Sequence, residues 1–161
     1  MSNYTIKKSS CLVRSNSLIC DANLLIARFK SSGDHLRTEA EYVLDKDYDL
    51  LLPISSLIEA FHACKPSVND LFEWILAPNR VEILPEDTTL TEEGMKMHRQ
   101  FPRLDLVDCL LLVYAKSIAN TCGWTKPIPI VTGDQPLMGI ARGFSSSYCF
   151  LDLNYPDNGV Q

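Results

Sequence analysis

The sequence lacks the features that would assign it to an oxidising compartment or to a membrane. Its six cysteines form no C-x-x-C pair, they lie mostly in apolar runs, and no stretch has the pattern of a signal peptide. The longest apolar run, LVDCLLLVYA, is too short to cross a bilayer and contains an acid. We therefore expect reduced thiols and a cytoplasmic protein without a membrane span.

Basic tracts and glycine-rich phosphate loops are also missing. The formal net charge is -5, which disfavours a protein that binds nucleic acid by positive charge alone. Neither G-x-x-x-x-G-K-[ST] nor the Rossmann glycine fingerprint occurs, so a nucleotide cofactor is not indicated. A polyanionic substrate would need a bound cation to offset the acidic charge.

Internal repeats and low-complexity linkers are absent too, and a length of 161 residues is typical of one domain. Residues 1–16 are polar and rich in serine, and residues 154–161 have the composition of a tail. We predict a polar N-terminal extension over 1–16, one domain over 17–153 and a C-terminal tail over 154–161.

Short apolar runs alternate with amphipathic segments through the central part of the chain. The alternation predicts an α/β fold, a three-layer α/β/α sandwich around a mostly parallel sheet. Ligands of such folds bind beyond the carboxyl ends of the strands. The predicted strands cover residues 17–20, 49–53, 80–85, 128–132 and 148–153, with helices between them.

Acidic residues occur near the carboxyl ends of the predicted strands, where the ligands of such folds bind. Asp21 and Asp134 follow predicted strands, and Glu59 lies in the helix after LLP. Asp108 is enclosed by apolar residues, with no Lys or Arg within four positions, and burying an unpaired carboxylate is costly. Carboxylates that converge without basic neighbours repel one another unless a hard cation binds them. This pattern indicates a site for Mg²⁺ or Mn²⁺.

Each acid also has a structural alternative as a helix cap or a turn residue. Capping is a poorer account of Asp108, because both of its flanks are apolar. Capping also leaves unexplained why the acids all follow strands of one sheet. The alternatives are an N-cap at Asp21, a capping box of Ser56 with Glu59, an N-cap at Asp105 with Asp108 at the third helical position, and a turn or cap at Asp134.

Four segments in order resemble the PIN domain, a metal-dependent nuclease fold that includes the toxins of many bacterial toxin–antitoxin pairs. They are LICDANLL, LLPISSLIEA, LDLVDCLLLVYA and IVTGDQPL, and the resemblance extends from about Ser17 to Leu153. It implies that the following residues form the site: the catalytic and metal-binding acids Asp21, Glu59, Asp108 and Asp134, and the supporting residues Asn23 and Thr132. Asp105 matches no constant position of the family and is a candidate outer acid only.

The resemblance also implies an activity and partners. The expected enzyme is an endoribonuclease that uses Mg²⁺ or Mn²⁺ to hydrolyse RNA and leaves a 5′ phosphate and a 3′ hydroxyl. RNA is the expected substrate, a homodimer the expected assembly and an antitoxin protein a candidate partner. One alternative is a non-catalytic PIN-fold binding module in an RNA-processing or regulatory complex. Another is a haloacid-dehalogenase-like phosphatase, which CDANL loosely resembles.

Overall fold

The computed structural model describes residues 16–78, 81–123, 125, 127–145 and 147–160. Most of the predicted N-terminal extension, residues 1–15, therefore lies outside the described residues. The strands form one five-stranded parallel sheet in the order β3-β2-β1-β4-β5. All the predicted strands are present: β1 (Ser17–Cys20), β2 (Asp49–Pro53), β3 (Val81–Leu84), β4 (Ile130–Thr132) and β5 (Phe150–Asp152).

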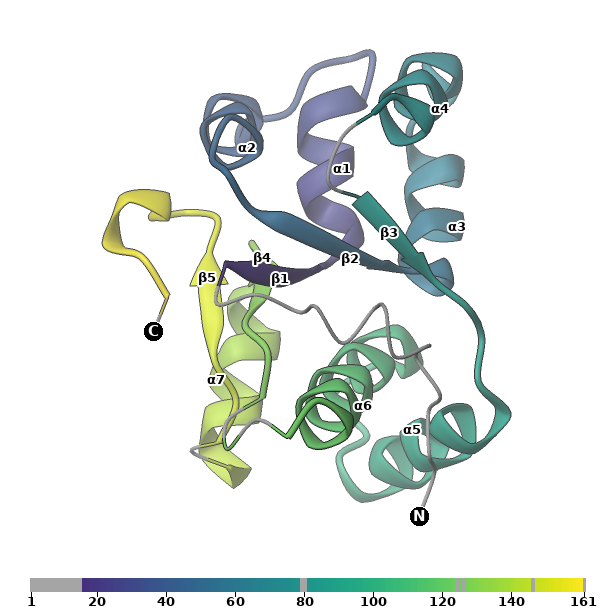
Figure 1. Ribbon diagram of the computed structural model, residues 1–161, viewed down its shortest axis with the longest axis vertical. Coiled ribbons are helices and arrows are strands. Elements are labelled where there is room, and N and C mark those ends of the chain that lie inside the picture. The colour runs from purple at the N-terminus through teal and green to yellow at the C-terminus, as the bar shows by residue number, and fades with distance from the viewer. Residues whose placement is uncertain (1–15, 79–80, 124, 126, 146, 161) are drawn as a thin grey trace.

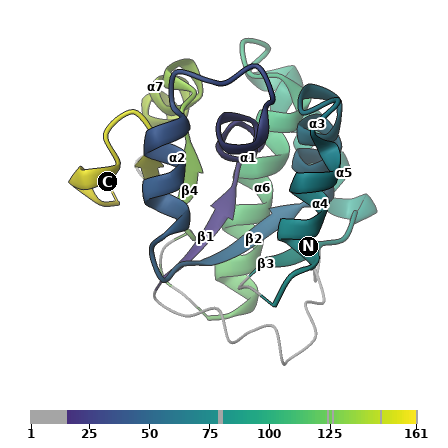
Figure 2. The same cartoon turned by 90° about the horizontal axis from the view of Figure 1, so that it is seen from above.

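Helices cover both faces of this sheet, so the predicted three-layer sandwich is confirmed (Figures 1 and 2). A short 3-10 helix, η1 (Pro156–Asn158), follows the last strand. One face carries α1 (Ala22–Phe29), α2 (Arg37–Leu44), α3 (Ile54–Ala63) and α4 (Val68–Leu76). The other carries α5 (Thr88–Gln100), α6 (Leu106–Thr121) and α7 (Gln135–Phe144).

The strands divide their side chains between the two helical layers. Leu18 and Cys20 of β1 belong to the apolar core beneath α1–α4, whereas Ile19 belongs to the core beneath α5–α7. Ile130 and Val131 of β4 divide in the same way. Because both faces of a parallel sheet are covered, its strands appear in the sequence as continuous apolar runs.

The direction of the chain reverses at the centre of the sheet. From β1 the chain builds β2 and β3 on one side and then returns to add β4 and β5 on the other. Beyond the carboxyl ends of two strands at such a reversal lies a crevice, the usual ligand site of this architecture. Cys20 of β1 pairs with Val131 of β4, so Asp21 and Thr132 come next to each other at this point.

The composition of α6 follows from its position. Its core residues pack against the sheet, and its other side packs against α5. The approach is close at Gly94, where a Cβ atom would lie 2.9 Å from Cδ2 of Leu110. Because it is covered on two sides, α6 is apolar around most of its circumference, and Asp108 lies in its first turn.

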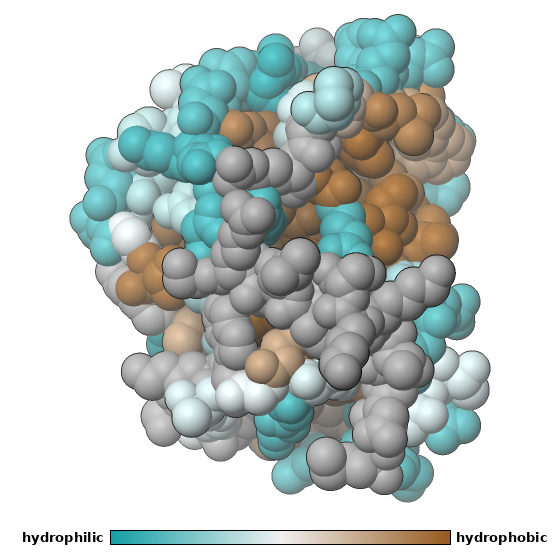
Figure 3. Space-filling view, viewed as in Figure 1, coloured by the Kyte–Doolittle hydropathy of each residue, from teal (hydrophilic) through white to brown (hydrophobic). Residues whose placement is uncertain are grey.

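Part of the surface remains apolar. Figure 3 shows hydrophobic surface on the right of the molecule, over α4 and the edge strand β3. Exposed residues of this region include Ile58 of α3, Phe72 and Leu76 of α4, and Ile83 of β3. No helix within the described ranges has both the length and the hydropathy needed to cross a membrane.

Candidate functional site

Asp21 occupies the N-cap position of α1, but its carboxylate is used elsewhere. The Thr132 hydroxyl donates a 2.6 Å hydrogen bond to Oδ2 of Asp21, and the Asp21 side chain makes no N-cap hydrogen bond to α1. Asp21 therefore holds the N-cap position, as the cap alternative predicts, but its side chain does not cap the helix. With 5% of its surface exposed, Asp21 is one of the few buried polar residues among those described.

The environment of Asp21 opposes its ionisation. The pKa of the Asp21 carboxyl is raised to about 6, mainly by burial and also by the charges of Glu59 and Asp134. Hydrogen bonds from Thr132 and from the backbone of Ala22 act in the opposite direction. Asp21 is thus a buried acid whose charge is stabilised by two donors and destabilised by two acids.

The turn after β4 carries the second acid of the site. The Asp134 amide donates to the Thr132 hydroxyl oxygen at 3.1 Å, and the Gly133 amide donates to Oδ1 of Asn23 at 3.0 Å. Oδ1 of Asp134 accepts from the Leu137 amide at 3.0 Å, which confirms Asp134 as the N-cap of α7. The cap uses one carboxylate oxygen, and Asp134 still acts electrostatically on the other acids.

Glu59 is not part of a capping box. Helix α3 begins at Ile54 with Pro53 at the N-cap, because β2 continues into the helix without a loop. Ser56 is therefore already inside the first turn and buried, so it cannot act as the N-cap for Glu59. The pKa of Glu59 is raised by partial burial and then by the charges of Asp105 and Asp134, although much of its side chain is exposed.

Asp108 has the most perturbed carboxyl group of the site. Asp105 is the N-cap of α6 and accepts a 2.8 Å hydrogen bond from the Asp108 amide, as the cap alternative for Asp105 predicts. The pKa of Asp108 is raised to about 8, first by partial burial and then by the charges of Asp105, Asp134, Asp21 and Glu59. The effect of Asp105 places this residue at the edge of the same acidic cluster.

All four acids of the predicted site are therefore close enough to act on one another. Among the described residues no Lys or Arg contributes to the pKa shifts of Asp21, Glu59 or Asp108. A cluster of carboxylate oxygens without a basic partner has the chemistry of a Mg²⁺ or Mn²⁺ site. In their present positions no three His, Cys, Asp or Glu side chains of the described chain could hold one metal ion. Binding an ion would require the carboxylates to move together.

A comparison with known families agrees with this geometry. Residues 18–122 match the PIN domain, which is more than half of the chain and includes Asp21, Glu59 and Asp108. The chain belongs to the PIN domain family. PIN domains are typically metal-dependent nucleases. A search of curated proteins found no match to the chain.

The matched part of this PIN domain ends before β4, so Thr132 and Asp134 join the site through the tertiary structure. The segment CDANL, on which the phosphatase alternative depended, lies within the residues that match the PIN domain, so the phosphatase alternative is not retained. Asn23, which stands where the phosphatase motif has an Asp, accepts a hydrogen bond from the Gly133 amide.

Sequence reasoning missed the contacts that hold this turn from its other side. The Asn154 side chain bonds to the carbonyl oxygen of Gly133, and that of Gln135 bonds to Asp152. Asn154 lies within the predicted tail, where polar residues are common and no spacing distinguishes it. The role of Asn154 can be recognised only in the folded protein, where β5 pairs with β4 and brings Asn154 to the turn.

Proposed function

We propose that this PIN domain is a metal-dependent endoribonuclease that hydrolyses RNA phosphodiesters. The observation that carries the proposal is the electrostatic coupling of Asp21, Glu59, Asp108 and Asp134, in which each neighbouring charge is negative. Repulsion among these carboxylates destabilises the metal-free protein at neutral pH. A bound divalent cation would offset this repulsion. Mg²⁺ or Mn²⁺ is therefore the proposed cofactor, held by these four acids.

Side chains of this protein hold the acids in place, and helix N-termini beside them favour an anionic phosphodiester. When bound, the metal ion would lower the pKa of a water molecule and offset negative charge on the phosphate. The Thr132 hydroxyl fixes one oxygen of Asp21, and Asn23 fixes the turn that presents Asp134. Helices α1, α6 and α7 begin beside these acids, and their N-terminal dipole ends favour an anionic group.

The first prediction is that the purified protein cleaves single-stranded RNA only with a divalent cation. Cleavage in Mn²⁺ should stop in excess chelator and return when Mn²⁺ is restored, because the acids do no chemistry without an ion. End labelling of the products should show a 5′ phosphate and a 3′ hydroxyl. Isothermal calorimetry should detect Mn²⁺ binding by the same preparation. Cleavage that persists in chelator would contradict the proposal.

A second candidate function is a PIN-fold binding module without turnover. The observation that favours it is that no three acids of the described chain could hold one ion as they stand. The same experiments separate the two functions. A module of this kind would give neither Mn²⁺ binding in the calorimeter nor cleavage.

The partners of the domain are also proposals. We infer a homodimer and, if the protein is the toxin of a toxin–antitoxin pair, an antitoxin encoded by an adjoining reading frame. Apolar residues exposed on α3, α4 and β3 support an interface on this side of the molecule. The cysteines within the described ranges are free thiols, which supports a reducing cytoplasm as the compartment, and cell fractionation tests this.

The second prediction concerns the dimer. Light scattering should give about twice the chain mass of 18.1 kDa, and Leu76→Asp should reduce it to the monomer value. Leu76 is 83% exposed, so a charge there does not disturb the core. Met95→Asp, on α5 of the opposite layer, is the matched control and should leave the dimer intact. A monomeric wild-type protein would refute the assembly.

A further inference from the structure

Asp134 lies between two residues that the end of the chain holds in place. On one side, Nδ2 of Asn154 donates to the carbonyl oxygen of Gly133 at 3.1 Å. On the other side, Nε2 of Gln135 donates to Oδ2 of Asp152 at 3.1 Å and to Oδ1 at 3.3 Å. The residues before and after Asp134 are therefore both bonded to β5 or to the segment that follows it.

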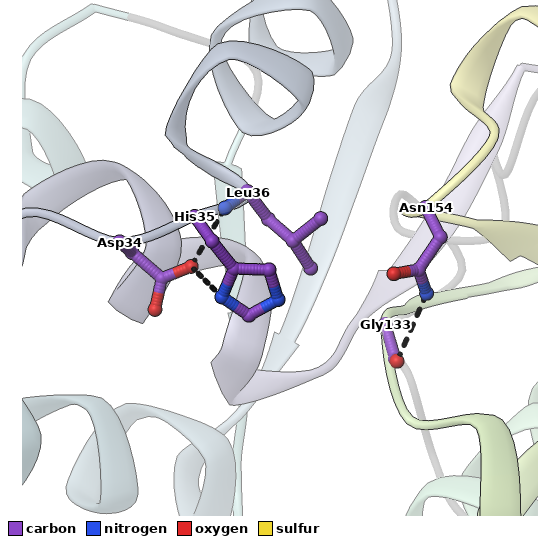
Figure 4. Close-up of polar contacts among 5 residues, drawn as sticks. All are labelled: Asp34, His35, Leu36, Gly133 and Asn154. Carbon is purple, nitrogen blue, oxygen red and sulfur yellow. Dashed lines mark hydrogen bonds and ion pairs between the residues drawn. The ribbon is translucent and has the colours of Figure 1, made fainter.

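The orientation of the Asn154 amide is fixed by its two acceptors. Besides the Gly133 carbonyl, Nδ2 lies 3.0 Å from Oδ1 of Asp152, and the Asn154 backbone amide donates to the same oxygen at 2.9 Å. Both acceptors require an N–H group, so the side chain cannot be reversed without placing its oxygen against a carbonyl and a carboxylate. Figure 4 shows the amide nitrogen directed at Gly133.

Gly133 is held on its other sides as well. Its amide donates to Asn23, and a Cβ atom on it would lie 3.0 Å from Cδ1 of Leu36 and 3.7 Å from Cβ of Leu153. Leu36 is itself fixed, because its backbone amide donates to Oδ1 of Asp34 at 2.9 Å (Figure 4). The carbonyl groups on either side of Gly133 are held by backbone amides, that of Thr132 by Leu153 at 2.8 Å and that of Asp134 by Met138 at 3.2 Å. The carbonyl of Gly133 is held by the side chain of Asn154.

We propose that Asn154 is a positioning residue for the metal site, which fixes the Thr132–Gly133–Asp134 turn so that the Asp134 carboxylate faces Asp21 and Asp108. The inference rests on the proposed metal-dependent function. In the described part of the chain Asn154 makes no hydrogen bond to the Asp134 carboxylate or to Asp21, Glu59 or Asp108, so it acts on the site through the carbonyl of Gly133. Residues that orient metal ligands typically change metal affinity by about tenfold to a hundredfold when they are replaced.

The test compares Mn²⁺ binding by Asn154→Ala with binding by the wild-type protein. Calorimetry should give a dissociation constant about tenfold higher for the variant, near the lower end of the range for outer contacts. Cleavage at limiting Mn²⁺ should fall, and saturating Mn²⁺ should restore most of it. A residue that only folds the C-terminal segment would lower the melting temperature and leave the Mn²⁺ dissociation constant unchanged.

Two further variants keep the test decisive. Asn158→Ala is the matched control, because Asn158 is an exposed asparagine of the same segment and only its backbone is recorded in a hydrogen bond. It should bind Mn²⁺ as the wild type does. Gln135→Ala replaces an exposed residue and tests the second contact if Asn154→Ala does not fold. It should weaken Mn²⁺ binding less than Asn154→Ala does and more than Asn158→Ala does.

The possible failures are distinguishable. If the wild-type protein binds no Mn²⁺, the proposed function is wrong and the role of Asn154 is wrong with it. If the wild type binds Mn²⁺ and the folded variants Asn154→Ala and Gln135→Ala bind it equally well, only the positioning role is overturned.

Discussion

Asp108→Asn should abolish metal-dependent cleavage of RNA. Asn keeps the shape of the side chain and removes a charge that Asp105, Asp134, Asp21 and Glu59 all oppose. We expect a loss of at least about a hundredfold, the upper end of effects seen around metal sites. The measurement is the rate of cleavage of single-stranded RNA in Mn²⁺, together with the Mn²⁺ dissociation constant from calorimetry.

The same substitution should stabilise the metal-free protein, and increasingly so as the pH rises. The pKa of Asp108 is raised to about 8, so between about pH 4 and pH 8 its carboxyl is protonated in the folded state and ionised in the unfolded state, and the wild type loses stability across this window. Asn does not titrate, so the melting temperature of the variant in chelator should exceed that of the wild type by a margin that is small near pH 4 and largest at about pH 8 and above.

Asp70→Asn provides the control for Asp108→Asn. Asp70 holds the same position in α4, the third residue of the helix, but it is not among the groups that act on the acidic cluster. The control should cleave RNA at the wild-type rate. Wild-type cleavage and metal affinity in Asp108→Asn would remove the basis of the nuclease assignment.

Without metal, the stability of the folded protein should fall as the pH rises. Asp21 and Asp108 have folded-state pKa values of about 6 and about 8, both above the ordinary aspartate value of 3.8. The folded state therefore binds more protons than the unfolded state between about pH 4 and pH 8, and protonation stabilises it in that window. Thermal melts in chelator should give a lower melting temperature at pH 8 than at pH 5.5.

A saturating divalent cation should reverse this trend. The cation binds the deprotonated acids, so its stabilising effect grows with pH. At about 100 times the dissociation constant, ligand binding adds about 2.7 kcal/mol, which corresponds to roughly 5–10 °C in melting temperature for a domain of this size. The measurement is the melting temperature at pH 8 with and without Mg²⁺. No rise at millimolar Mg²⁺ or Mn²⁺ would exclude the metal site.

Local sequence patterns were sufficient for the secondary structure. The run DLLLP coincides with β2, and LDLVDCLLLVYAKSIANT corresponds closely to α6, because apolar runs and helical periodicity depend on neighbouring residues. The start of α3 was not predictable in this way. Ser56 and Glu59 have the spacing of a capping box, but the covalent continuity of β2 and α3 places the first helical turn at Ile54.

The sequence by itself determined the layers of this protein and named the candidate acids of its site. Alternating apolar strands and amphipathic helices favour a parallel sheet with helices on both faces, and such a sheet brings the residues after its strands to one edge. Asp21, Glu59 and Asp134 were named on this basis, and Asp108 from its apolar flanks; the resemblance to the PIN domain joined the four. A PIN domain was the expected result, and the family comparison confirmed it.

Only the tertiary structure decided how each acid is used. The bond from Thr132 to Asp21 joins residues 111 positions apart, and the contact between Asn154 and Gly133 joins residues 21 positions apart. Such bonds depend on the packing of β1, β4 and β5 beside one another and leave no spacing in the sequence. A helix cap and a candidate site acid look the same in sequence, because either can follow the end of a strand. Packing decided that the Asp134 side chain caps α7 and that the Asp21 side chain bonds Thr132 instead of capping α1.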